Sequence, residues 1–248
     1  MSLLKREELF IGKPVPLKEI CLVYPLSAYQ VFNLTQEKYT LYLNLLTMSD
    51  EDLKDIFEEK NIEYNNETVF SHLMKGCLND GNFLLDVKRA FFTFIREGVQ
   101  ILPEEGIIIV GDIKEKRIIN ESAFLELQNI LRLQNRLEME EIPPENEDEM
   151  HKKFRLRRKA LKKAKKKKAQ KEANSENSID FYAIVKSLII NKVINYEDLD
   201  KFCIFAIHEL FDMAQAQEEY KNQISFICAG ADSKKMKMKY WIKNSYEK

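Results

Sequence analysis

The feature that most constrains the fold is a run of positive charge near the middle of the chain, residues 151–172 (HKKFRLRRKALKKAKKKKAQKE). This run holds thirteen of the 39 basic residues in the chain, and its only acidic residue is Glu172. A segment that is polar on every side cannot be buried in a core. The core must therefore be built from the sequence on either side of the run.

The composition of the run predicts an exposed helix. Lys, Arg, Ala, Gln and Leu favour helix, and neither Gly nor Pro interrupts them. Pro143 and Pro144 lie just upstream among acidic residues, where they end the preceding helix and leave acids for the first turn of the next one. Without the thirteen cations of the run, the chain has 26 basic and 40 acidic residues, a formal charge of −14. The sequence thus indicates an acidic body with one basic arm.

Three interpretations of the basic arm remain open at this point. It could be a solvated spacer between two packed halves, a contact for nucleic acid, or an arm that docks on an acidic protein. The arm has no aromatic residue besides Phe154, so we do not expect it to stack on bases. The residues that would carry either binding role are Arg155, Arg157, Arg158, Lys162, Lys163, Lys165, Lys166, Lys167 and Lys168.

The remaining sequence predicts a mainly α protein with a small β-meander. A chain of 248 residues with 45% hydrophobic content can bury a sizeable core, and only seven Gly and six Pro argue against an all-β fold. We expect two helical packs joined by a long basic helix. The corresponding domains are 1–137, with a small sheet at about 99–119, a linker at 138–177, and 178–248.

Local patterns give the boundaries of the elements. Ser27, Ser49, Ser178 and Asn195 are the predicted helix N-caps, and Gly98 is a predicted C-terminal glycine. We expect an extended, strand-poor segment over 1–26, strands at 99–102, 107–110 and 117–119, and helices over 28–46, 49–60, 67–78, 82–97, 123–137, 179–192, 196–228 and 233–244. The stripe of Phe83, Val87, Phe91 and Ile95 is the predicted centre of the N-terminal core.

No motif in the sequence indicates a reaction. His72 and Cys77 are five residues apart, as are Cys203 and His208, and this spacing does not place both side chains on one helical face. The glycines of residues 106–111 have the spacing of a phosphate-binding loop, but an acid follows them in place of the lysine. We therefore predict no catalytic residues, no metal site, no cofactor and no enzymatic activity.

The cysteines and the hydropathy indicate a reducing compartment and no membrane. Cys21, Cys77, Cys203 and Cys228 lie among apolar neighbours without metal or redox spacing, so we expect buried thiols. The N-terminus has no apolar stretch of signal-peptide length, and no run of about 18 apolar residues occurs.

A second feature that could bind a partner lies near the C-terminus. Met238, Trp241 and Ile242 have the i, i+3, i+4 spacing of one helical face, and lysines surround them. Two interpretations stay open: the helix packs on its own domain, with lysine stems covering the edges, or it anchors a partner helix or groove.

Three stretches of the chain resemble proteins encoded by phages and prophages of low-GC Gram-positive bacteria. They are VYPLSAYQVFNLTQEKYTLYLNLL (23–46), IIIVGDIKEKRIINESAFLELQNILRLQNRL (107–137) and EEYKNQISFICAGADSKKMKMKYWIKN (218–244). The order of segments, with a lysine-rich stretch between the halves, is similar too. The resemblance implies a member of the tail-morphogenesis group, similar in kind to a tail assembly chaperone. Such a chaperone is helical and non-enzymatic, coats the tape-measure protein and recruits tail-tube subunits.

The sequence therefore predicts a non-enzymatic phage tail assembly or virion-associated protein that works through protein–protein contacts. The expected partners are phage structural proteins, with tape-measure or tail-tube subunits foremost, in the host cytoplasm or the virion. The alternative is a nucleic-acid-binding module that uses residues 152–171, although the acidic remainder would oppose the approach of DNA.

Overall fold

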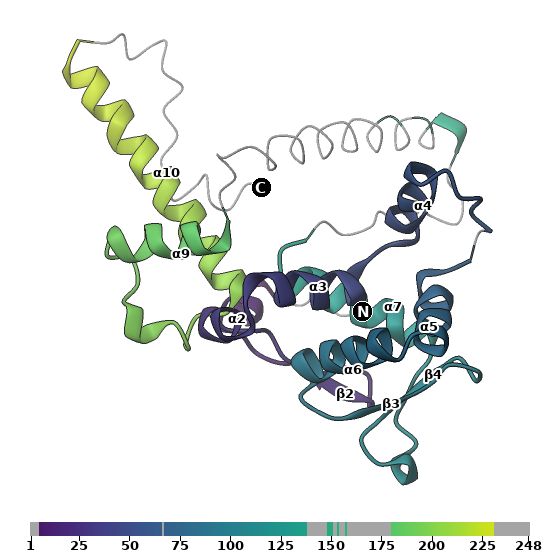
Figure 1. The fold of residues 1–248 in the computed structure, drawn as a ribbon. Coiled ribbons are helices and arrows are strands. Elements are labelled where there is room, and N and C mark those ends of the chain that lie inside the picture. The colour runs from purple at the N-terminus through teal and green to yellow at the C-terminus, as the bar shows by residue number, and fades with distance from the viewer. Residues whose placement is uncertain are drawn as a thin grey trace.

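A computed structural model describes residues 5–65, 67–137, 148–150, 153, 157 and 180–230 (Figure 1). Helices predominate in these residues, and the sheets are small and antiparallel, which confirms the predicted mainly α class with a small β component. The helices are α1 (Arg6–Phe10), α2 (Ala28–Leu34), α3 (Gln36–Thr47), α4 (Asp50–Glu59), α5 (Val69–Asn79), α6 (Gly81–Ile95), α7 (Glu121–Gln134), α9 (Phe181–Ile190) and α10 (Ile204–Cys228), with 3-10 turns η1 (Ile113–Glu115) and η2 (Tyr196–Asp198).

The strands form two separate sheets. One is the hairpin of β1 (Val15–Leu17) and β2 (Cys21–Val23), and the other is the meander of β3 (Val99–Leu102), β4 (Ile107–Val110) and β5 (Ile118–Ile119). The meander matches its predicted strands to within one residue. The hairpin was not predicted, and neither was α1, so the expectation of an extended, strand-poor segment over 1–26 is wrong. Pro16 is tolerated in β1 because proline is compatible with an edge strand.

The core cluster includes the buried sides of α6 and α7, and α3 packs against both of these helices. The predicted stripe of α6 is buried at Val87, Phe91 and Ile95 and partly buried at Phe83. The α7 side of this core consists of Phe124, Leu127, Ile130 and Leu131, each at most 2% exposed.

Polar side chains of α7 donate hydrogen bonds to the carbonyls at the C-terminal end of α3. The side chain of Arg132 donates to the Thr47 carbonyl through Nε and Nη2, at 3.1 and 2.6 Å, and Gln128 Nε2 donates to the Met48 carbonyl at 2.7 Å. The final carbonyls of a helix have no partner within it, so a buried helix end needs such donors. These contacts explain why Gln128 and Arg132 are buried on an otherwise apolar face.

Two of the predicted helices are each divided into two elements in the structure. The predicted helix over 28–46 divides at Thr35, whose φ of 70° ends α2 and whose hydroxyl accepts from the Lys38 amide at the start of α3. The predicted helix over 196–228 divides between η2 and α10. There the carbonyls of Leu199 and Phe202 accept hydrogen bonds from the amides of Tyr29 and Ala28. These carbonyls bond to the start of α2 and not to amides of a continuous helix.

Three predicted end signals are also corrected. The N-cap of α9 is Asp180, and the predicted cap Ser178 lies outside the described residues. The helix α10 begins after Cys203, so Asn195 precedes only the 3-10 turn η2. The α6 helix ends at Ile95, and its C-cap is Arg96, which adopts a φ of 63° and lies two residues before the predicted glycine Gly98.

Among the described residues, one connected core joins the N-terminal and C-terminal halves. Ile184, Val185 and Leu188 of α9 belong to the same buried cluster as the residues of α6 and α7. The predicted linker over 138–177 is described only at 148–150, 153 and 157, so the division into three domains stays a prediction. In the parts of the chain that the structure describes, no helix is both long enough and apolar enough to cross a membrane.

Candidate protein-interaction site

The helix α10 is anchored at one end and exposed at the other. Its first turn carries Ile204, Phe205, Ala206 and Ile207, all of which are buried. Beyond Ala214 its side chains are exposed or only partly buried, and Figure 1 shows the helix extending away from the rest of the described chain. We call residues 215–228 the distal half of α10. At about 1.5 Å per residue it is roughly 20 Å long.

The buried carboxylate of Glu209 fastens residues 204–214, which we call the proximal half of α10. The Glu209 side chain is 10% exposed and forms ion pairs with Arg6 of α1 and with Arg136, the latter at 3.4 Å. Arg136 also pairs with Asp212 at 3.0 Å, and its guanidinium lies 5.9 Å from the centre of the Phe205 ring. We call Arg6, Arg136, Glu209 and Asp212 the anchor cluster. It joins α1, the segment that follows α7, and α10, which fixes where α10 leaves the body.

His208 lies next to the anchor cluster and is held neutral. Burial lowers the pKa of His208, and the nearby positive charge of Arg136 lowers it further, against smaller opposite effects of Asp212 and Glu209. Its ring centre is 5.9 Å from that of Phe181 in α9. The partly buried histidine thus contributes packing between α9 and α10 at neutral pH.

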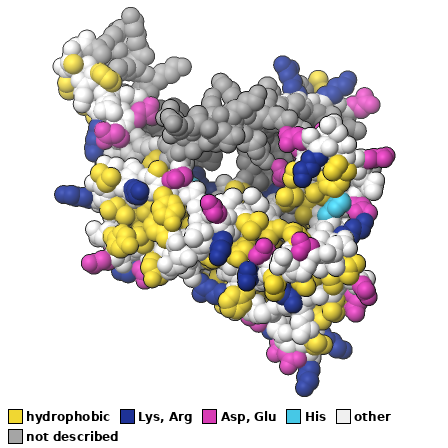
Figure 2. All heavy atoms as spheres, viewed as in Figure 1, with side chains coloured by type: hydrophobic (Ala, Val, Ile, Leu, Met, Phe, Trp, Pro, Cys, Tyr) yellow, Lys and Arg dark blue, Asp and Glu magenta, His cyan; other side chains and the backbone are white. Residues whose placement is uncertain are grey.

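The distal half of α10 presents apolar side chains to solvent. Ile224 is 38% exposed and Phe226 is 58% exposed. Figure 2 shows hydrophobic side chains on this end of the molecule, next to acidic ones. Aromatic side chains are enriched where proteins bind one another, so this end of the helix is a candidate contact surface.

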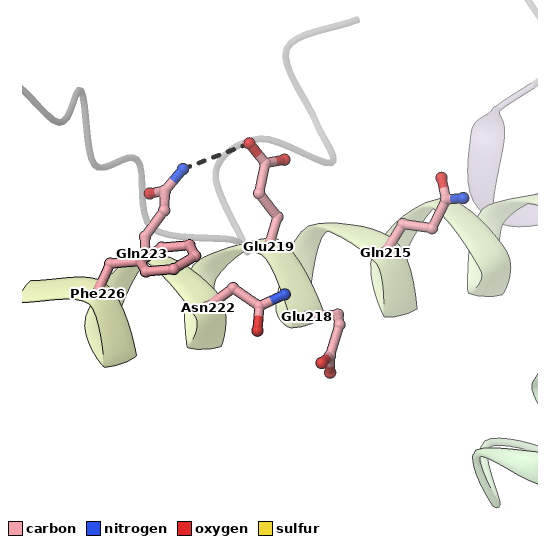
Figure 3. Close-up of a pocket in the computed structure, with 6 residues that line it drawn as sticks. All are labelled: Gln215, Glu218, Glu219, Asn222, Gln223 and Phe226. Atoms are coloured by element: carbon pink, nitrogen blue, oxygen red, sulfur yellow. Dashed lines mark hydrogen bonds between the residues drawn. The ribbon is translucent and has the colours of Figure 1, made fainter. Parts of the chain in front are cut away.

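One face of the distal half also lines a shallow groove (Figure 3). Gln223 Nε2 donates to Glu219 Oε1 at 3.3 Å, while the carboxylate of Glu218 points the other way. The acids therefore do not converge on a common point, and the groove offers amide and carboxylate groups for recognition beside one aromatic ring. Its lining residues are Gln215, Glu218, Glu219, Asn222, Gln223 and Phe226.

The residues that the sequence singled out for binding fall mainly outside the described chain. Met238, Trp241 and Ile242 lie there, as do Arg155, Arg158, Lys162, Lys163, Lys165, Lys166, Lys167 and Lys168 of the basic arm. Arg157 is described, and it is helical and exposed. The roles proposed for these residues stay predictions.

No local pattern in the sequence indicates the anchor cluster. Its charges lie far apart in the chain, from Arg6 to Asp212, and no local spacing connects them. One signal was present: Glu209 interrupts the apolar start of a long helix, where an acid needs a partner to be buried.

The cysteines are buried thiols with one exception. Cys21, Cys77 and Cys203 are buried, whereas Cys228 at the end of α10 is exposed, so the expectation of four buried thiols is wrong at that position. Burial raises the pKa of Cys21 to about 12 and that of Cys77 to about 11, which keeps both in the unreactive thiol form. In the ranges that the structure describes, no group of three His, Cys, Asp or Glu side chains is arranged to hold a metal ion.

These observations define a mainly helical protein with an anchored, projecting helix. Comparison with protein families adds one match: residues 165–246 match the family described as the YomV second domain, which is associated with Bacillus prophages. The matched region includes α9 and α10. The match is consistent with a phage protein and does not specify tail morphogenesis. No match was found among curated proteins or among solved structures.

Proposed function

We propose that this chain is a non-enzymatic phage assembly protein of the tail-morphogenesis group, and that the distal half of α10 is a docking arm for another phage protein. The observation that carries the proposal is the asymmetry of α10. Its proximal half is locked by the anchor cluster, while its distal half exposes Ile224 and Phe226. A fixed base with an exposed apolar end favours recognition, because little conformational freedom is lost when a partner binds.

The family match also supports the proposed docking role of the C-terminal part of the chain. It covers α9, α10 and the sequence that carries Met238, Trp241 and Ile242. A domain that recurs in a prophage-associated family and presents apolar side chains suits a protein that holds other phage proteins during assembly. We propose the tape-measure protein or the tail-tube subunit as its partner, since both must be kept in solution before the tail is built.

Co-purification tests this function. The full chain would be co-expressed with the tape-measure protein or the tail-tube protein of the same prophage, beside Ile224→Ser and Phe226→Ser variants. We expect co-purification with wild type and a loss of about tenfold or more in each variant, since exposed aromatic anchors carry much of the binding energy of an interface.

The matched control is Ile113→Ser in η1. Ile113 is 56% exposed, close to the 58% of Phe226, and it lies outside α10. The substitution Ile113→Ser should therefore leave co-purification unchanged. Failure of both phage proteins to co-purify with wild type would contradict the proposal.

A further inference from the structure

The solvent face of α6 carries a stripe of alternating apolar and basic side chains. Leu85, Arg89 and Phe92 follow one another at intervals of four and three residues, which places them on one side of the helix. Arg96 follows as the exposed C-cap residue, with a φ of 63°. Leu85 is 49% exposed and Phe92 is 58% exposed. We call these four residues the α6 stripe.

The α6 stripe is held on a rigid support. The opposite side of α6 is part of the main core, and the Asp80 side chain accepts from the amides of Asn82 and Phe83 at the first turn. At the other end, the Arg96 guanidinium lies 4.3 Å from the centre of the Tyr24 ring. Three side chains on a helix fixed at both ends, with a fourth at its C-cap, form a surface that does not need to rearrange to bind.

The local charge of the stripe is opposite to that of the body. Residues 81–96 contain Lys88, Arg89 and Arg96 against one acid, Asp86, whereas the chain without the cations of the basic run carries −14. Asp86 lies 3.4 Å from Arg89 in an exposed pair, which is worth little in water and leaves the guanidinium able to take another partner. Figure 2 shows hydrophobic, basic and acidic side chains side by side in the region of α3 and α6.

We propose that the α6 stripe binds an acidic amphipathic helix of a partner protein. This inference rests on the proposed function and adds a second docking surface to it. Leu85 and Phe92, seven residues apart, would meet the apolar side of the partner helix, and Arg89 and Arg96 would pair with carboxylates on its edges. Phe and Arg are both enriched at protein interfaces, and Arg also at interface hot spots.

The test uses the full chain and a fluorescein-labelled helical peptide of about 18 residues, or roughly five turns. The peptide has leucines along one face and glutamates elsewhere, and a second peptide replaces each glutamate with lysine. Fluorescence anisotropy would give Kd for wild type, Phe92→Ser and Arg89→Glu. Both substitutions are at exposed positions, and their melting curves would confirm that the variants fold.

We expect the glutamate peptide to bind wild type, each variant to raise Kd about tenfold, and the lysine peptide not to bind. The matched control, Leu125→Ser, changes a side chain of α7 that is 49% exposed, like Leu85, and should leave Kd unchanged. The proposal is overturned if the glutamate peptide does not bind, if it binds the variants equally, or if the lysine peptide binds as tightly.

Self-association of wild type that Arg89→Glu abolishes would also overturn the proposal, because the occupant would then be a second copy of the chain. Sedimentation of the protein alone measures this. The proposed docking role of α10 has separate variants and a separate readout. If the glutamate peptide does not bind the α6 stripe while the phage proteins still co-purify through α10, only this inference is refuted.

Discussion

Replacing Glu209 with alanine should loosen the attachment of α10 and destabilise the whole fold. Glu209 is the shared carboxylate of the anchor cluster, and its side chain is 10% exposed, against 40% for Arg6 and 27% for Arg136. Removing one partner of a fully buried ion pair costs about 3–5 kcal/mol, while an exposed pair is worth about 0–1 kcal/mol. With a buried acid and partly exposed cations, we expect a loss of about 2 kcal/mol in the free energy of unfolding.

Thermal and urea denaturation followed by circular dichroism measure this loss. For a chain of this size, about 2 kcal/mol corresponds to a decrease in Tm of about 4–8 °C. Glu218→Ala removes a carboxylate from the exposed distal half of the same helix and should change stability by less than about 0.5 kcal/mol. A double-mutant cycle with Arg136→Ala should show a coupling of at least about 0.5 kcal/mol. The reasoning is refuted if Glu209→Ala is as stable as Glu218→Ala.

The remaining predictions concern pH, thiol reactivity and nucleic acid. Burial holds the pKa of His208 below the ordinary histidine value of about 6.5, so the unfolded chain takes up the proton first as the pH falls. Stability should therefore decrease as the pH drops below about 6.5. The variant His208→Gln should flatten that part of the curve of Tm against pH. A thiol reagent should label the native protein chiefly at Cys228, so that Cys228→Ser removes most of the rapid labelling, which mass spectrometry would measure. In a gel shift near physiological salt, wild type and a variant with lysines 165–168 changed to glutamine should bind duplex DNA equally weakly; tight binding by wild type alone, with a log–log salt slope of about −0.9 per contacted phosphate, would instead favour the nucleic-acid alternative.

The sequence was most informative where local rules decide the structure. Ser27 and Ser49 cap α2 and α4 as predicted, and both form capping boxes, in which each cap and the residue three positions later exchange hydrogen bonds. β3 and β4 have the predicted bounds because an apolar run, a turn and a second apolar run form a local pattern. The periodic stripe of α6 likewise identified the core.

Long-range contacts decided the elements that the sequence did not predict. The break before α10 arises because the backbone around Phe202 bonds to residues near Ala28, more than 170 positions away along the chain. The β1–β2 hairpin is continued by a bond from the Tyr24 amide to the Phe94 carbonyl at the end of α6. Such pairings depend on the complete fold, and a short strand that contains Pro16 gives no local signal strong enough to reveal them.

The candidate site, too, depends on the complete fold and could not be predicted from local sequence patterns. The sequence indicated that binding residues should exist, and it selected those with conspicuous composition, the lysine-rich arm and the helix around Trp241. It did not indicate the distal half of α10, because Ile224 and Phe226 look like ordinary core residues in a helical pattern. Only their exposure in the folded chain identifies them as a surface.

Hydrogen–deuterium exchange of the full chain, alone and with the purified tape-measure or tail-tube protein, tests the central claim most directly. The amides of residues 215–228 lie on the exposed part of α10, so they should exchange quickly in the free protein and markedly more slowly when the partner is bound. Unchanged exchange across this range in the presence of both partners, at concentrations where a complex forms, would contradict the claim that α10 is the docking arm.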